Sequence, residues 1–135
     1  MTGKNHQFVP LKDPLTIPVR WEFKEHEYTQ LVKGNDESKS VWRCFMADNT
    51  FHIYKGFTGG LEHFRFSFKK GSNSTHIVDN LETFNRIDFY KSAKRYGWTK
   101  TEIENQKLEH NKLSVAEVTE LFSYFFNIDL VEKSK

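Results

Sequence analysis

The chain has 135 residues, of which 16% are aromatic, and its 20 Lys and Arg residues nearly balance its 18 Asp and Glu residues, giving a formal net charge of +2. This length fits one domain with one well-buried core. The charge balance falls short of the strongly basic composition of nucleic-acid-binding domains, and the sequence holds no cluster of Lys and Arg that would attract an anionic membrane surface.

The cysteine content and the N-terminal sequence predict a cytoplasmic protein. Cys44 is the only cysteine, so an intrachain disulfide cannot form, and a lone thiol suits a reducing compartment. The N-terminal stretch MTGKNHQFVPLKD lacks the apolar core of a signal peptide, and no apolar run reaches transmembrane length.

The first segment of the chain contains every proline. These prolines stand at positions 10, 14 and 18, so residues 1–18 are predicted to form an extended arm, followed by a single α+β domain over residues 19–130. Alternation of apolar and polar residues predicts a strand over residues 19–23. Residues 24–33 are polar with apolar residues at helical spacing, which predicts a short helix ended by Gly34.

Residues 41–71 are the most informative stretch, because two turn signals divide them into consecutive β-hairpins. The pairs at 48–49 (Asp-Asn) and 59–60 (Gly-Gly) tolerate the positive φ angles that two-residue hairpin turns require. Counting outward from each turn gives the register. The first turn pairs Trp42 with Lys55, Cys44 with Ile53 and Met46 with Phe51, and the second pairs Phe51 with Phe68, Ile53 with Phe66, Lys55 with Phe64 and Phe57 with Glu62.

The two predicted hairpins share one apolar face, since side chains alternate between faces along a strand. Only Lys55 and Glu62, near the end of this face, interrupt it. A displacement of one residue in either hairpin would scatter the face, so the two turn predictions support each other. Its apolar members are Trp42, Cys44, Met46, Phe51, Ile53, Phe57, Phe64, Phe66 and Phe68.

The opposite face of the predicted sheet carries the candidate site. In the predicted register Arg43, Tyr54 and Arg65 lie directly side by side across three strands, and His52 and His63 flank this row. Guanidinium groups can stack on a tyrosine ring or offer paired donors to a phosphate or carboxylate. A solvated sheet face, with long polar side chains lying over aromatic neighbours, is the alternative interpretation.

A last strand and a series of helices complete the predicted chain. Residues 75–80 predict a strand that would make the antiparallel sheet four- or five-stranded. From Asp88, a candidate N-cap, the apolar period becomes helical. Thr99 and Glu102 then fit the capping-box spacing and predict a separate helix as far as about His110.

The predicted C-terminal helix is the clearest element. Ser114 and Glu117 match a second capping box, and an apolar stripe follows at helical spacing. This stripe needs a partner surface, which the Phe-rich sheet face provides. The predicted fold is therefore a single α+β domain, with an antiparallel four- to five-stranded sheet and a C-terminal amphipathic helix packed on one face. The stripe consists of Val115, Val118, Leu121, Phe122, Phe125 and Phe126.

The sequence contains no recognisable catalytic or cofactor motif, so no cofactor is predicted. The glycines of the second hairpin have no following helix that could bind a phosphate. One cysteine and six scattered histidines lack the spacing of zinc ligands, and His52 and His63 lack a third ligand. An enzyme would have to use Glu62 with His63, His52 with Glu22, or Tyr54, whose pKa flanking arginines would lower.

One motif resembles a known group of proteins. The sequence YKGFTG at residues 54–59 is similar to a motif of small, mostly uncharacterised bacterial proteins, in which a Trp-bearing strand precedes a strand ending in Tyr-Arg-Ser-Trp-Thr-Gly and a further strand follows. The resemblance spans residues 40–128 and implies a small α+β domain, without a known activity. Trp42, Tyr54, Thr58 and Gly59 match, Lys55, Gly56 and Phe57 differ, and Asn85, Arg86, Asp88 and Tyr90 resemble an Asn-Arg-Asp…Tyr segment of that group, with the Asp one position late.

Three functions fit the sequence. The leading hypothesis is a non-catalytic protein-interaction module of immunity, inhibitor or regulatory type, which binds a protein partner through Arg43, His52, Tyr54, His63 and Arg65, because Trp, Tyr and Arg are favoured in binding hot spots. The second is binding of a nucleotide or single-stranded nucleic acid through the Arg–Tyr–Arg row. The third is a small hydrolase or nuclease that uses His52, His63 or Glu62.

Overall fold

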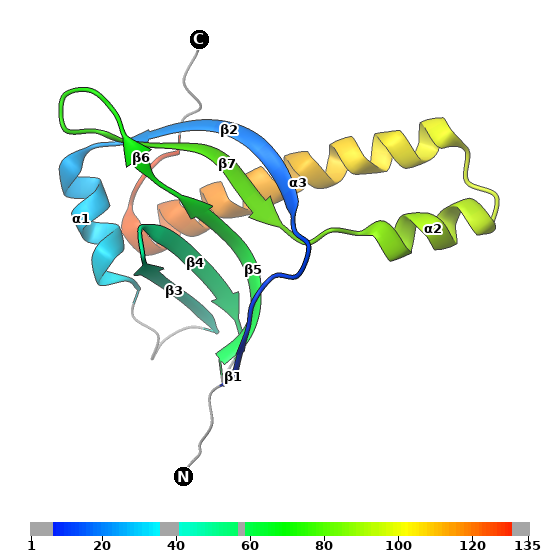
Figure 1. Cartoon of the computed structure of the whole chain (residues 1–135), viewed down its shortest axis with the longest axis horizontal. Helices are drawn as coiled ribbons and strands as arrows, with labels where there is room; N and C mark the ends of the chain where they lie inside the picture. The colour runs from blue at the N-terminus through cyan, green and yellow to red at the C-terminus, as the bar shows by residue number, and fades with distance from the viewer. Residues whose placement is uncertain (1–6, 36–40, 57–58, 131–135) are drawn as a thin grey trace.

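The computed structural model describes residues 7–35, 41–56 and 59–130, and in these ranges a largely antiparallel sheet packs against a long C-terminal helix (Figure 1). The predicted α+β class with an amphipathic C-terminal helix is confirmed. The five longer strands follow the spatial order β2 (Leu15–Phe23), β7 (His76–Thr83), β5 (Gly59–Ser67), β4 (Thr50–Lys55) and β3 (Trp42–Ala47), and each is antiparallel to its neighbours.

Two short strands extend the sheet. The strand β1 (Gln7–Val9) pairs in parallel with the first residues of β5, and β6 (Lys69–Lys70) pairs with the start of β7. Part of the predicted N-terminal arm therefore takes part in the sheet, since β1 and the first residues of β2 both precede residue 19. The buried side chain of Leu11 lies between them in the sequence.

The first predicted hairpin is confirmed residue by residue. Asp48 and Asn49 have φ angles of 51° and 63°, as a two-residue turn requires. The register pairs Cys44 with Ile53 and Met46 with Phe51. The two turn residues and the alternating pattern on either side thus suffice to specify β3 and β4.

The predicted register of the second hairpin is wrong. Phe66 pairs with Phe51, not with Ile53, so β5 is displaced by two residues and its phenylalanines keep their face. A β-bulge in β5, between the pairs made by Ile53 and Tyr54, then places Glu62, not Arg65, opposite Tyr54. The predicted partner Phe57 lies outside the described residues.

The glycine pair at 59–60 lies in β5 and does not form the predicted two-residue turn. Gly60 has a φ angle of 91°, and a Cβ atom at this position would lie 2.1 Å from the carbonyl oxygen of Lys55. The glycine pair therefore marks a close approach of two backbones beside the bulge, and not a hairpin turn.

The apolar core lies between the sheet and the C-terminal half of α3 (Lys100–Phe126), as predicted. The Phe122 ring lies 5.6 Å from that of Phe51, 5.7 Å from that of Phe66 and 5.9 Å from that of Phe23, measured between centroids. Each of these buried rings stabilises the fold by about 1.5–3 kcal/mol. Trp21 on β2 is also buried and contacts Phe66 edge-on.

The remaining helices begin and end close to the predicted positions. The helix α1 covers Glu25–Lys33 and ends at Gly34, where a Cβ atom would lie 2.6 Å from the Cys44 carbonyl oxygen. The helix α2 covers Ile87–Arg95 and follows Arg86, so the predicted N-cap Asp88 lies in its first turn.

The predicted break between two C-terminal helices is wrong, because α3 is one continuous helix of 27 residues. The capping box of Thr99 and Glu102 starts this helix, as predicted. Ser114 lies buried within it. No Gly or Pro occurs between His110 and Ser114, so nothing interrupts the backbone hydrogen bonds there.

A helical hairpin of α2 and the first half of α3 extends beyond the sheet (Figure 1). This part of the molecule is thinly packed: Ala93 is the buried residue of α2, and Ile103 is the buried residue in the first turns of α3. None of the helices in the described ranges has the length and apolar character needed to cross a membrane.

Candidate functional site

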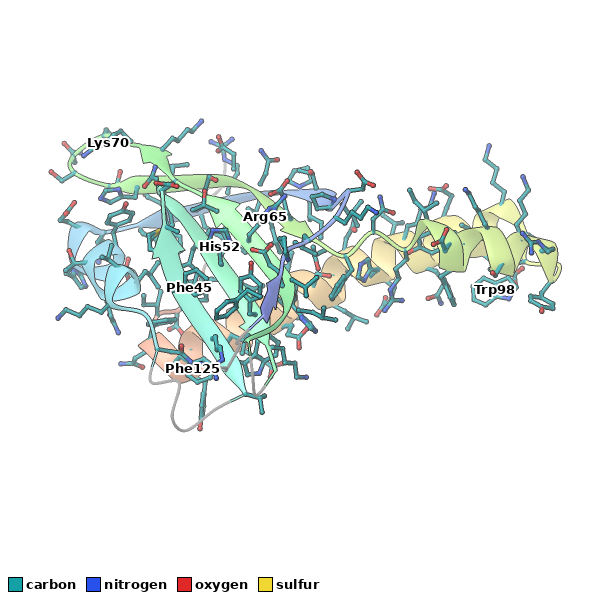
Figure 2. The ribbon with its side chains drawn as sticks, turned by 60° about the horizontal axis from the view of Figure 1, so that its bottom comes forward. Phe45, His52, Arg65, Lys70, Trp98 and Phe125 are labelled. Carbon is teal, nitrogen blue, oxygen red and sulfur yellow. The ribbon has the colours of Figure 1, made fainter. Side chains whose placement is uncertain are left out.

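The outer sheet face is the surface of β3, β4 and β5 that points away from α3, and Figure 2 shows Phe45, His52 and Arg65 on it. Arg43 pairs with Tyr54 as predicted, but Arg65 pairs with His52. The predicted row of Arg43, Tyr54 and Arg65 is therefore wrong at its third member. The outer sheet face comprises Arg43, Phe45, His52, Tyr54, Glu62 and Arg65 of these three strands, together with the neighbouring Phe8 of β1 and Glu82 of β7.

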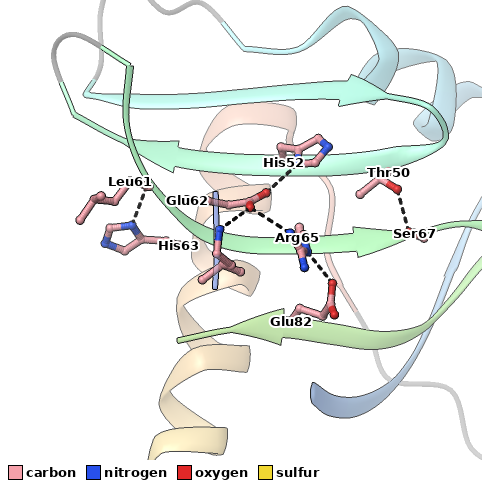
Figure 3. Close-up of polar contacts among 9 residues, drawn as sticks. Thr50, His52, Leu61, Glu62, His63, Arg65, Ser67 and Glu82 are labelled. Atoms are coloured by element: carbon pink, nitrogen blue, oxygen red, sulfur yellow. Dashed lines mark hydrogen bonds and ion pairs between the residues drawn. The ribbon is translucent and has the colours of Figure 1, made fainter. Parts of the chain in front are cut away.

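Glu62 is the centre of a hydrogen-bonded network on this face (Figure 3). Its carboxylate accepts hydrogen bonds from His52 Nδ1 at 2.5 Å, from the Leu11 backbone N–H at 2.9 Å and from Arg65 Nη1 at 3.4 Å. Its side chain is completely buried, whereas the His52 side chain is 21% exposed. One carboxylate thus connects the segment after β1 with strands β4 and β5.

Burial and hydrogen bonding act on the pKa of Glu62 in opposite directions. Burial by itself would raise this pKa. The hydrogen bonds from His52 and from the Leu11 backbone, together with the positive charges of His52 and Arg65, outweigh burial and lower the pKa below its ordinary value. Glu62 is therefore ionised at neutral pH and acts only as an acceptor, so His52 donates from Nδ1.

Arg65 is held by two carboxylates. Its Nε donates to Glu82 Oε1 at 2.6 Å, in addition to its contact with Glu62. The hydrogen bond to Glu82 is the main reason that the pKa of Arg65 is raised, although burial opposes it. The charge of this guanidinium group is thus already compensated within the protein.

Tyr54 lies within a cluster of aromatic rings. The Phe45 ring stacks on it with centroids 5.6 Å apart, and the Phe8 ring meets it edge-on at 4.9 Å. Tyr54 is only 6% exposed. Burial, followed by the negative charge of Glu62, raises its pKa, while Arg65 opposes this shift. The prediction of a lowered pKa for Tyr54 is therefore wrong, because burial outweighs the arginine.

His63 does not join the other predicted site residues. Its ring contacts Trp42 at 5.5 Å and Phe84 at 4.8 Å between centroids, and its Nδ1 donates to the Leu61 carbonyl oxygen at 3.1 Å. The bulge in β5 is the reason, because it turns Glu62 toward the outer sheet face and His63 away from it. His63 therefore does not lie beside His52, as a metal site shared by the two histidines would require.

Three contributors to this site were not predicted from the sequence. Phe8 and Leu11 come from the predicted N-terminal arm, and Glu62 was predicted on the apolar face. A parallel pairing of β1 with β5 has no local sequence signal, and the glycine pair at 59–60 was the only sign of irregularity near the bulge. Within the ranges that the structure describes, no group of three or more His, Cys, Asp or Glu side chains could hold a metal ion.

No protein-family model, curated protein or solved structure matches this chain. The resemblance to the bacterial group with the Tyr-Arg-Ser-Trp-Thr-Gly motif stays a prediction.

Proposed function

We propose that this protein is a non-catalytic protein-interaction module that binds its partner through the outer sheet face. The observation that carries this proposal is a cluster of aromatic rings on a face that α3 does not cover. Phe8 is 42% exposed, and Phe45 and His52 are half-buried beside the buried ring of Tyr54. Aromatic anchors of this kind dominate the binding energy of protein interfaces.

The charges of the outer sheet face favour a protein over a nucleic acid as the partner. Arg65 is paired with Glu62 and Glu82, and His52 is paired with Glu62. Binding of a nucleic acid draws its affinity from cations that are free to neutralise phosphates. Because these cations are occupied within the protein, the aromatic surface is the better source of affinity, and nucleotide binding by Arg43, Tyr54 and Arg65 is disfavoured.

The outer sheet face is also held in position before a partner arrives. The hydrogen bonds of Glu62 fix His52 and the segment at Leu11, and the stack of Phe45 on Tyr54 fixes two rings. Less conformational entropy is lost on binding when side chains are already ordered, so more of the contact energy appears as affinity.

The proposal is tested by comparing wild type with the variants Phe45→Ala and Phe8→Ala in affinity capture from an extract of the source cells. A captured protein is then purified and its dissociation constant measured by calorimetry. We expect each variant to weaken binding by about 30-fold, the effect of losing a hot-spot contact of about 2 kcal/mol.

Phe89→Ala is the matched control, because Phe89 is an exposed phenylalanine on α2, away from the outer sheet face. It should bind the partner like wild type. Equal affinity of the Phe45→Ala and Phe89→Ala proteins would refute the assignment of this face. The affinity of the wild-type complex should depend only weakly on salt concentration.

A hydrolase is the second candidate, and one observation favours it. The buried carboxylate of Glu62 orients the His52 ring through Nδ1, which leaves Nε2 for proton transfer, as in enzymes where a carboxylate positions a catalytic base. Wild type and His52→Gln are compared with ester and phosphodiester substrates. Turnover that His52→Gln abolishes would support this candidate, and turnover that persists would exclude it.

A further inference from the structure

The helical hairpin contains a cleft of about 790 Å³ between α2 and α3, and Leu15 and Trp98 are among the residues that line it. Figure 2 shows Trp98 at the far end of this hairpin, remote from His52 and Arg65. None of the residues that line the cleft belongs to the outer sheet face. Its volume lies within the range of about 300–1,000 Å³ that is typical of sites for small ligands.

The charges that line the cleft are strongly unbalanced. The residues that line the cleft include five cationic side chains but one carboxylate, that of Glu104. The cationic residues are Arg86, Lys91, Lys94, Lys100 and Lys107. This excess contrasts with the whole chain, whose net charge is only +2. A cleft with one sign of charge concentrates ligands of the opposite sign.

The lysines of the cleft differ in their partners. Lys107 forms an ion pair with Glu104 at 3.6 Å and lies 5.4 Å from the centre of the Tyr90 ring. Lys91, Lys94 and Lys100 form no ion pair with any residue in the described part of the chain. These three ammonium groups are thus available to an anionic ligand, in contrast to Arg65 on the outer sheet face.

The cleft also offers aromatic and polar groups. Trp98 is 36% exposed, and the ring of Phe89 supports it edge-on at 5.9 Å between centroids. Tyr90 Oη and Asn111 Oδ1, both on lining residues, are buried without a hydrogen-bond partner among the described residues. Buried polar groups rarely stay unpaired, so the inner wall has unused hydrogen-bonding capacity.

From these observations we propose that the cleft between α2 and α3 binds a nucleoside phosphate. The ligand's phosphates lie among Lys91, Lys94 and Lys100, and its base stacks on Trp98. A planar ring next to a phosphate is the chemistry that matches aromatic side chains interleaved with free cations. A free nucleotide and the end of a single-stranded nucleic acid share this chemistry. The proposal is independent of the proposed function, because it concerns other residues.

The test measures binding of ATP, inorganic phosphate and a short single-stranded deoxythymidine oligonucleotide to the full chain. The site variant is Lys91→Gln/Lys94→Gln/Lys100→Gln. Its matched control is Lys12→Gln/Lys33→Gln/Lys112→Gln, which removes the same charge from exposed lysines outside the cleft. Circular dichroism confirms that both variants are folded.

We expect ATP or the oligonucleotide to bind wild type and the control alike, and the site variant to bind about tenfold more weakly or worse. Binding should quench tryptophan fluorescence, and Trp98→Phe should remove the quenching. If the oligonucleotide binds, three lost phosphate contacts should reduce the slope of log K against log salt by about 2.

The pattern of ligands identifies the source. Tight binding of ATP assigns the cleft to free nucleotides, and binding of the oligonucleotide alone assigns it to a nucleic acid strand. Three results overturn the proposal: no binding of either probe at about 1 mM, equal weakening by the site and control variants, or inorganic phosphate binding as tightly as ATP.

Discussion

At the scale of a single residue, the bulge in β5 decides what Glu62 does. In the predicted register Glu62 interrupts the apolar face, where a carboxylate would be costly. The bulge adds one residue to β5 and turns the Glu62 side chain to the outer sheet face. There His52, Arg65 and the Leu11 backbone donate hydrogen bonds to its carboxylate. The bulge thus removes a charge from the core and supplies the acceptor that holds three segments together.

The substitution Glu62→Gln should lower the free energy of unfolding by about 2–3 kcal/mol, because it leaves the charge of Arg65 partly uncompensated and weakens the hydrogen bond from His52. Urea denaturation measures this change. The control Glu104→Gln removes an exposed partner of Lys107 and should change stability by no more than about 0.5 kcal/mol. Equal effects of the two substitutions would contradict the network.

The pH dependence of stability provides a second test of Glu62. Its pKa in the folded protein is lower than the ordinary value of 4.5, so the ionised carboxylate stabilises the fold above that pH. This contribution is lost as the pH falls from 4.5 through the lower folded pKa. In this window the stability of wild type should fall more steeply than that of Glu62→Gln, by up to about 1.4 kcal/mol per pH unit. Parallel curves would show that the pKa is not lowered.

At the scale of an element, α3 shows how two similar local signals have different outcomes. The Thr99 hydroxyl accepts from the Glu102 N–H, and the Glu102 carboxylate accepts from the Thr99 N–H, so this capping box starts the helix. Ser114 with Glu117 has the same spacing but lies within the continuous helix. A capping box needs free N–H groups, and at Ser114 the preceding turn already occupies them.

This difference predicts unequal effects of two alanine substitutions. Thr99→Ala should lower the free energy of unfolding by about 1 kcal/mol, because the N-cap is lost. Ser114→Ala should change it by no more than about 0.5 kcal/mol in either direction, since Ala is the better helix former inside a helix. Chemical denaturation of both variants measures the two effects. A clear loss on Ser114→Ala would indicate that a helix begins there after all.

At the scale of the whole molecule, stability is unevenly distributed. The sheet and the C-terminal half of α3 share the core that Phe51, Phe66 and Phe122 form. The projecting hairpin has few buried side chains, and its exposed apolar residues include Leu108 and Leu113. Local opening costs little where few apolar contacts are lost.

Native-state hydrogen exchange should therefore separate the two parts. Amides of α2 (Ile87–Arg95) should exchange at least about tenfold faster than those of β4 and of the last turns of α3, because the hairpin can open without disturbing the core. Mass spectrometry or NMR measures these rates. Uniform protection throughout α3 would show that the hairpin is as stable as the body. Protection of α2 should rise when the proposed nucleoside phosphate binds.

Sequence alone determined the local features of this protein: the alternation in β3 and β4, the turn at Asp48 and Asn49, the capping box at Thr99 and the apolar stripe of the last helix. Each is encoded within a few residues, because side-chain direction and turn geometry follow local backbone conformation. The apolar face and the helix that covers it followed from these patterns.

Only the tertiary structure decided the bulge at Glu62, the parallel pairing of β1 with β5, and the cleft between α2 and α3. Leu11 and Glu62 are 51 positions apart in the chain, and their hydrogen bond forms only when the strands between them are in place. Such contacts depend on which register buries the most apolar surface and satisfies the most polar groups, a balance over the whole molecule that no short stretch of sequence encodes.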